Sequence, residues 1–189
     1  MDAGVTLRTF LGLPLATAFQ GDIAPLIEKL KRDHPEVRWV KASEIHVTLH
    51  FFGSIEAEEI PKIKQLVSSV TERSRPLELC LKGVGGFPNL GRPRVVWVGI
   101  EGATEPLKAL QAAIERELGK AGFPGEAREF KPHLTLGRVK EGGRVSGIDQ
   151  VFFGATEQKK LSELVLFQSH LSPEGARYER IATFPLSAP

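Results

Sequence analysis

His46-Val47-Thr48-Leu49 and His133-Leu134-Thr135-Leu136 are two copies of one pattern, His-x-Thr-Leu, in a chain of 189 residues. Residues two apart in a β-strand point to the same face of a sheet, so each copy places one imidazole beside one hydroxyl. Two such strands facing each other would bring two histidines and two threonines to one cleft. These groups suit acid–base chemistry on a phosphate, so the pattern predicts both a strand pair and a site.

The separation of the two copies recurs in the sequence around them. The two histidines lie 87 positions apart, and Phe10-Leu11-Gly12-Leu13 precedes Trp97-Val98-Gly99-Ile100 by the same 87 positions. The helical pattern between strand and motif repeats as well, with Ile23 matching Leu110 at this shift. We therefore expect two divergent copies of a strand–helix–strand unit, related by a pseudo-two-fold axis.

The composition is that of an ordinary soluble globular protein, with 41% hydrophobic and 25% charged residues. The net charge of +2 is too small to attract nucleic acid over long distances. The single cysteine, Cys80, excludes an internal disulfide and favours a reducing compartment.

The apolar stretch Phe10–Phe19 contains an Ala-x-Ala pattern, but Pro14 interrupts it, so we expect a core strand rather than a signal peptide. No apolar run approaches the roughly 18 residues that span a bilayer, and we expect a cytoplasmic protein.

The apolar periodicity predicts an α+β fold. Period-3.6 patterns predict helices over 22–33, 54–71 and 104–122, with Asp22 as an N-cap, and alternating patterns predict strands over 4–11, 37–39, 45–52, 76–84, 94–100, 132–139, 161–171 and 176–184. Gly53 is expected to stop one strand, and Ser172–Gly175 to form a turn. Several strands are joined by short turns, so we expect mostly antiparallel sheets, with helices outside and a central cleft.

The glycine- and proline-rich segment Gly83–Pro93 is the best candidate boundary between the repeats. We expect one domain, residues 1–189, in which the repeats 4–84 and 94–184 form two lobes.

The two motif histidines supply the groups that phosphodiester cleavage requires. Histidine titrates near pH 6.5, so one imidazole can accept a proton from water while the other donates a proton to the departing alkoxide. The hydroxyls of Thr48 and Thr135 can donate to the non-bridging phosphate oxygens. We expect no metal, because a catalytic zinc site needs a third ligand. His46 and His50 lie four residues apart, which suits zinc on a helix, but the pattern here is that of a strand.

Longer segments carry a resemblance to a known family. The paired motifs resemble those of the 2H phosphoesterase superfamily, and their flanks resemble its RNA 2′,3′-cyclic phosphodiesterase branch, once described as 2′-5′ RNA ligases. The matching segments follow in order along nearly the whole chain: Arg8–Phe10, His46–Gly53, Gly83–Pro88, Pro93–Trp97, Phe130–Arg138 and Tyr178–Leu186.

This resemblance implies a two-lobed fold whose motifs face a central cleft, and an activity. The implied reaction opens a terminal RNA 2′,3′-cyclic phosphate to a 2′-phosphate without metal or other cofactor, with His46 as proton donor and His133 as proton acceptor. Weak 2′-5′ ligation is implied as a side activity. The expected partners are RNA ends or oligonucleotides that carry a 2′,3′-cyclic phosphate, and we expect a monomer with no membrane contact.

The same resemblance draws attention to two further residues. Arg138 resembles the family's phosphate-contacting arginine, and a plain surface role is the alternative. His50 stands where the family has arginine. By strand parity it shares the face of His46 and Thr48, so it would bind substrate phosphate, or else remain a structural histidine at the rim. Phe10 and Trp97 are candidates for base stacking or for core packing.

Two other functions remain open at this point. One is hydrolysis of a small cyclic metabolite of the ADP-ribose 1″,2″-cyclic phosphate type, which needs the same cleft chemistry. The other is a catalytically silent nucleotide- or RNA-binding module, against which the intact histidines and threonines argue.

Overall fold

A computed structural model describes residues 5–172 and 175–188 of the chain. Its strands and helices are β1 (Thr6–Pro14), α1 (Ala16–Asp33), β2 (Val37–Trp39), β3 (His46–Glu56), α2 (Ile60–Thr71), β4 (Leu77–Phe87), β5 (Val95–Gly102), α3 (Thr104–Lys120), β6 (His133–Val139), β7 (Lys159–Leu161), β8 (Glu163–Ser172) and β9 (Gly175–Pro185). Residue 4 of the first predicted strand and residues 173–174 of the predicted turn lie outside the described residues.

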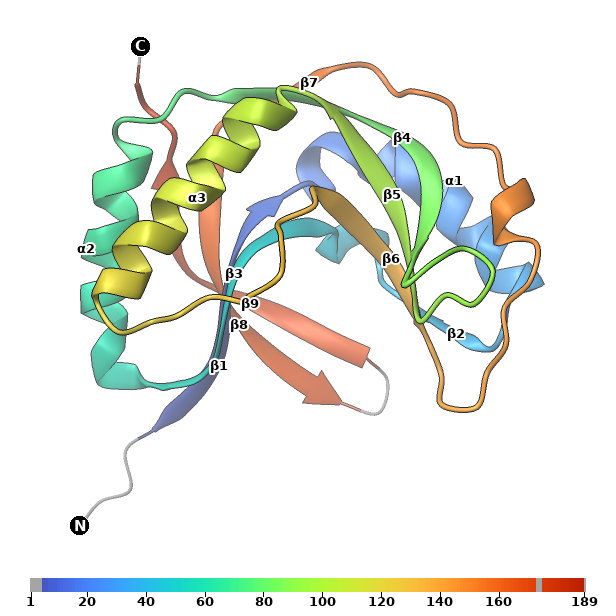
Figure 1. Ribbon diagram of the computed structural model, residues 1–189, viewed down its shortest axis with the longest axis horizontal. Coiled ribbons are helices and arrows are strands. Elements are labelled where there is room, and N and C mark those ends of the chain that lie inside the picture. The colour runs from blue at the N-terminus through green and yellow to red at the C-terminus, as the bar shows by residue number, and fades with distance from the viewer. Residues whose placement is uncertain (1–4, 173–174, 189) are drawn as a thin grey trace.

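The described strands form two antiparallel sheets. The first has the order β3-β1-β8-β9 and the second the order β2-β6-β5-β4-β7. Helices α2 and α3 lie side by side over the first sheet, and α1 lies over the second (Figure 1). The predicted α+β class with antiparallel sheets and outer helices is confirmed.

The two sheets do not coincide with the two predicted repeats. The strands β2 and β4 belong to the first repeat but pair in the second sheet, whereas β8 and β9 belong to the second repeat and pair in the first sheet. This exchange arises because α1 carries the chain across to the second sheet, and β8 returns it to β1. Each sheet therefore contains strands from both repeats.

Apolar stripes hold the helices against the sheets. The buried side chains of α1 include Ile23 and Ile27, and those of α3 include Leu110 and Ile114, the positions that match in the repeat. One continuous cluster of buried apolar side chains joins both sheets to α1, α2 and α3. Burial of such side chains is the main favourable term in folding.

Several predicted boundaries are wrong, and each has a local reason. Helix α1 begins at Ala16, not at Asp22, because Phe19 already packs in the core. Strand β3 continues through Gly53, whose φ of 74° absorbs an irregularity in the pairing with β1, and ends at Glu56. A capping box between Glu56 and Glu59 then starts the helical turn before α2, so Ser54 is not a helix start.

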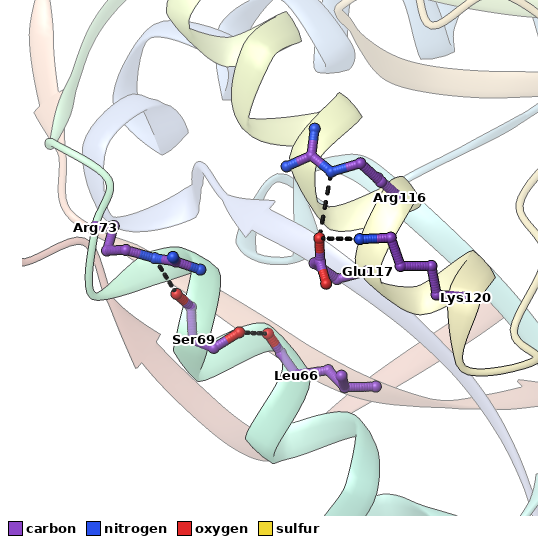
Figure 2. A network of polar contacts seen from close by, with 6 residues as sticks. All are labelled: Leu66, Ser69, Arg73, Arg116, Glu117 and Lys120. Atoms are coloured by element: carbon purple, nitrogen blue, oxygen red, sulfur yellow. Dashed lines mark hydrogen bonds and ion pairs between the residues drawn. The ribbon is translucent and has the colours of Figure 1, made fainter.

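The exposed sides of α2 and α3 carry local polar contacts (Figure 2). On α3, Glu117 accepts hydrogen bonds from Arg116 at 3.2 Å and from Lys120 at 3.1 Å. After α2, the Arg73 side chain donates to the carbonyl oxygen of Ser69 at 2.8 Å. Exposed ion pairs of this kind contribute about 0 to 1 kcal/mol each, so they add little beside the buried core.

A pair of leucines tests this view of the fold. Leu11 in β1 is 0% exposed, whereas Leu171 near the end of β8 is 67% exposed. We expect Leu11→Ala to lower the free energy of unfolding by about 2 to 5 kcal/mol, because it leaves a cavity in the core. Leu171→Ala should change it by no more than about 0.5 kcal/mol. Urea denaturation measures both, and equal losses would contradict the placement of β1 in the core.

Candidate active site

Both motif strands carry one extra residue directly after the His-x-Thr pair. In β3, Thr48 lies opposite Gly12 and His50 opposite Leu11, so Leu49 is unmatched. In β6, the same irregularity leaves Leu136 unmatched, because Thr135 lies opposite Trp97 and Gly137 opposite Val96. Such β-bulges break the alternation of side chains along a strand.

The bulges decide which side chains share a face with the histidines. After the bulge in β3, His50 turns toward the helix side and Phe51 toward the face of Phe10, against which it packs. After the bulge in β6, Gly137 faces the helix side, where an added Cβ would meet Val37 and Trp39. Arg138 therefore turns toward the histidines. Each motif strand thus presents histidine, threonine and one later side chain to the same face.

The two histidines are held in the same way. The Nδ1 atom of His46 lies 2.9 Å from the carbonyl oxygen of Glu44, and Nδ1 of His133 lies 2.7 Å from that of Lys131. A carbonyl oxygen only accepts hydrogen bonds, so each Nδ1 carries the proton and donates it. This leaves each Nε2 with a lone pair when the ring is neutral, or with a transferable proton when it is charged.

Aromatic rings surround both imidazoles. Phe10 stacks on His46 at 4.6 Å between ring centroids, and Tyr178 meets it edge-on at 5.0 Å. Phe87 meets the His133 ring edge-on at 5.0 Å, and Trp97 lies 6.4 Å from it. Phe10 and Trp97 thus form the walls of the histidine sites.

Glycine makes room for one of these walls. An added Cβ at Gly85 would lie 2.1 Å from the Trp97 indole, so only glycine lets the ring lie flat on β4. The indole keeps its place beside His133 because the strand below it has no side chain there.

These surroundings disfavour the charged form of both histidines. Burial lowers the pKa of His46 to about 4, with the hydrogen bond to Glu44 opposing and the charges of Arg138 and His133 adding to the shift. Burial also lowers the pKa of His133, and Arg138 lowers it further. Since these groups act on one another electrostatically, the structure places His46, His133 and Arg138 near one another.

The threonines add two hydroxyl groups to this site. Thr48 is exposed and Thr135 half-buried, and neither hydroxyl has a hydrogen-bond partner in the described part of the chain. Both hydroxyls are therefore available to a ligand. Across residues 5–172 and 175–188, no group of three or more His, Cys, Asp or Glu side chains is arranged to hold a metal ion.

His50 does not lie in this site, which corrects the placement inferred from strand parity. It is 2% exposed, and its Nδ1 lies 2.8 Å from the carboxylate of Glu115 on α3. Its ring also lies 4.3 Å from that of Phe52, beside a cavity of about 250 Å³ on the helix side. The physical reason is the bulge at Leu49, which turns His50 away from His46 and Thr48.

The structure adds residues to which the sequence assigned no role. Tyr178 and Phe167 reach His46 from the β8–β9 hairpin, and Arg8 lies 4.6 Å over the Phe51 ring. Arg8 and Arg138 also act electrostatically on the Tyr178 hydroxyl, whose pKa is raised mainly by burial. The sequence offered a signal for Arg8 and Tyr178, since each begins a segment that resembles the family, but none for Phe167.

Comparison with known proteins places these observations in a family context. The family model described as the 2′-5′ RNA ligase superfamily matches residues 19–162. The RNA 2′,3′-cyclic phosphodiesterase of Methanothermobacter thermautotrophicus is 32% identical over 188 residues, which cover 95% of this chain and 99% of that protein. A protein of the same name from Archaeoglobus fulgidus is 32% identical over 183 residues, with 94% and 99% covered.

Solved structures share the fold along nearly the whole chain. The protein TT0787 of Thermus thermophilus has a TM-score of 0.77 at 29% identity, with 96% of this chain and 99% of that chain covered. The structure of E. coli LigT complexed with 3′-AMP has a TM-score of 0.78 at 24% identity, with 97% and 99% covered. No helix among the described residues is long and apolar enough to cross a membrane.

The placement of His50 predicts a structural role for it. We expect His50→Ala to lower the free energy of unfolding by about 2 kcal/mol or more, because it removes a buried ring and a hydrogen bond to a carboxylate. KM for a ribonucleotide 2′,3′-cyclic phosphate should change less than about threefold, in contrast to Arg138→Ala. Urea denaturation and steady-state kinetics measure the two effects. If His50→Ala instead raises KM strongly without loss of stability, His50 contacts the substrate and the structural role is wrong.

The lowered pKa of His46 predicts a loss of stability in acid. The unfolded chain binds a proton at this histidine near pH 6.5, whereas the folded chain does so only near pH 4. Between these values the unfolded state binds more protons, so the free energy of unfolding should fall as the pH falls from 6.5 toward 4. Urea denaturation across this range should show a shallower decline for His46→Gln than for the unaltered chain. Parallel curves would contradict the shift.

Proposed function

Because the chain belongs to the 2′-5′ RNA ligase superfamily, we propose that it hydrolyses the 2′,3′-cyclic phosphate at the end of an RNA to a 2′-phosphate, without a metal ion. The observation that carries this proposal is the matched pair of histidines. Each imidazole is fixed through Nδ1 to a backbone carbonyl, which leaves its Nε2 free. The names of the archaeal relatives support the same activity.

The proposed reaction needs one proton acceptor and one proton donor. Nε2 of His133 accepts a proton from a water molecule as the water oxygen attacks phosphorus. Nε2 of His46 donates its proton to the 3′ oxygen as the bond from phosphorus to that oxygen breaks. The products are a 2′-phosphomonoester and a free 3′-hydroxyl. Each proton transfer contributes on the order of 10² to 10⁴ in rate.

The remaining groups act on the charge of the phosphate. The hydroxyls of Thr48 and Thr135 donate to the non-bridging oxygens, on which negative charge increases in the transition state. Arg138 supplies a full positive charge near both histidines. Because these groups are placed before substrate arrives, they need little rearrangement during the reaction.

The low pKa of His46 sets a condition on its role as donor. In the free chain this imidazole is neutral at pH 7, since its pKa is about 4. A bound phosphate carries negative charge, which favours the protonated ring and raises its pKa. The donor role, taken from the family, therefore requires that the substrate itself brings His46 into its charged form.

A weak 2′-5′ ligation follows from the same chemistry. If the 5′-hydroxyl of a second RNA takes the place of water, its oxygen attacks phosphorus and the 3′ oxygen leaves as before. The product then carries a 2′-5′ phosphodiester.

The decisive experiment uses an RNA oligonucleotide that ends in a 2′,3′-cyclic phosphate, with EDTA present. We expect a 2′-phosphate product, and a loss on the order of 10² to 10⁴ in rate for His46→Ala and for His133→Ala. His34→Ala serves as a control, because the His34 ring forms a hydrogen bond with Glu36 outside the site.

The same substrate tests the pH dependence. Because both motif histidines have a pKa below 6.5, the plot of kcat/KM against pH should be bell-shaped, with its maximum below pH 6.5.

Other outcomes would contradict parts of this proposal. A 3′-phosphate product would reverse the assigned bond cleavage, and inhibition by EDTA would overturn the metal-independent mechanism. Full activity of either histidine variant would remove that residue from the reaction. Turnover of ADP-ribose 1″,2″-cyclic phosphate but not of RNA would change the substrate class.

A further inference from the structure

Two arginines face each other across the edge of the second sheet. Arg38 in β2 lies directly opposite Arg138 in β6, and the flanking pairs are Val37 with Val139 and Trp39 with Gly137. Side chains directly opposite in an antiparallel pair share one face, with Cβ atoms about 4.5 to 5.5 Å apart. The two guanidinium groups therefore start from neighbouring positions.

Both arginines lie on the histidine side of this sheet. Val37 is 4% exposed, and an added Cβ at Gly137 would meet Val37 and Trp39, so these three residues face α1. Arg38 alternates with Val37 and Trp39 along β2 and must point to the opposite face. On that face Arg138 acts on both histidines.

Among the described residues, neither arginine has an acidic partner. Both are exposed, and neither takes part in an ion pair or hydrogen bond there. By contrast, the exposed Lys82 in β4 lies 3.3 Å from the carboxylate of Glu101 in β5. Like charges directly opposite in a sheet are destabilising. Phosphate anions bound beside the two guanidinium groups would offset this repulsion.

We propose that Arg38 binds the phosphodiester that precedes the terminal ribose of the RNA, beside Arg138 at the cyclic phosphate. This inference rests on the proposed function. β2 is the edge strand of its sheet, so Arg38 lies one strand spacing, about 4.8 Å, from Arg138, on the side away from β5. An RNA strand that leaves the site over β2 would meet the two arginines with successive phosphates. Arginine suits this contact, since its planar fork matches phosphate oxygens.

Arg38 then becomes a specificity-determining residue rather than a catalytic one. A nucleoside 2′,3′-cyclic phosphate has no phosphate on its 5′ side and offers nothing for Arg38 to bind. An oligonucleotide with the same cyclic end offers one. The protein should therefore prefer the oligonucleotide, and this preference should depend on Arg38.

The test compares two dinucleotides with a 2′,3′-cyclic end, one with a normal internal phosphodiester and one with an uncharged methylphosphonate. For the unaltered protein, we expect the methylphosphonate to lower kcat/KM about tenfold, mainly through KM, because a charge-assisted contact is lost. For Arg38→Gln, kcat/KM on the normal dinucleotide should fall by a similar factor, and the methylphosphonate should cause less than about a twofold further loss. Arg38→Lys should restore part of the loss.

Arg116→Gln is the matched control, because Arg116 is an exposed arginine of α3 that pairs with Glu117 (Figure 2). It should respond to the methylphosphonate as the unaltered protein does. If Arg38→Gln lowers both rates equally, or neither, the inference is overturned while the proposed function stands. If the unaltered protein hydrolyses neither dinucleotide, the proposed function itself fails.

Discussion

In both motif strands one extra residue follows the His-x-Thr pair, and this bulge decides which side chains reach the site. Without it, strict alternation would place His50 and Gly137 beside the histidines. With it, those positions turn to the helix side, and Phe51 and Arg138 face the site instead. A bulge is fixed by the hydrogen bonds of the neighbouring strand, so the site depends on β1 and β5 as much as on the motifs themselves.

Burial of the imidazoles follows from the same arrangement. Phe10 in β1 and Trp97 in β5 both reach the adjacent motif histidine, and each lies within the segment that repeats at 87 positions. The aromatic walls exclude water from one side of each ring and so favour the neutral form. A neutral imidazole with a fixed Nδ1 proton is a base at Nε2. In the proposed mechanism, His46 becomes an acid only when the substrate anion favours its charged ring, so proton transfer would be coupled to the presence of substrate.

Short-range patterns in the sequence were sufficient for some features and not for others. The pairing of His46 with Thr48, and of His133 with Thr135, follows from the two-residue period of a strand, and the buried stripes of α1 and α3 follow from helical periodicity. The side of the sheet on which His50 lies could not be predicted from a local pattern. It depends on the bulge, and the bulge depends on the register with β1, which no local pattern encodes. The start of α1 at Ala16 was missed for a similar reason: Phe19 joins the core only through tertiary contacts. Arg38 had no motif at all, and only the pairing of β2 with β6 places it beside Arg138.

The repeat supplies two histidines of similar geometry, but the residues around them differ. Two positions after the unmatched leucine, the first motif strand has Phe51 and the second has Arg138, 87 positions later. Both histidines have aromatic neighbours, but the charges differ: Arg8 lies over Phe51 on the β3 side, whereas Arg38 lies directly opposite Arg138 on the β6 side. A cyclic phosphate at an RNA end is itself asymmetric, with a charged phosphate on one side and a ribose on the other. Under the proposed function, we expect these unequal flanks to select one orientation of the substrate. That orientation, rather than the shared motif, would then determine which histidine meets the water and which meets the leaving oxygen.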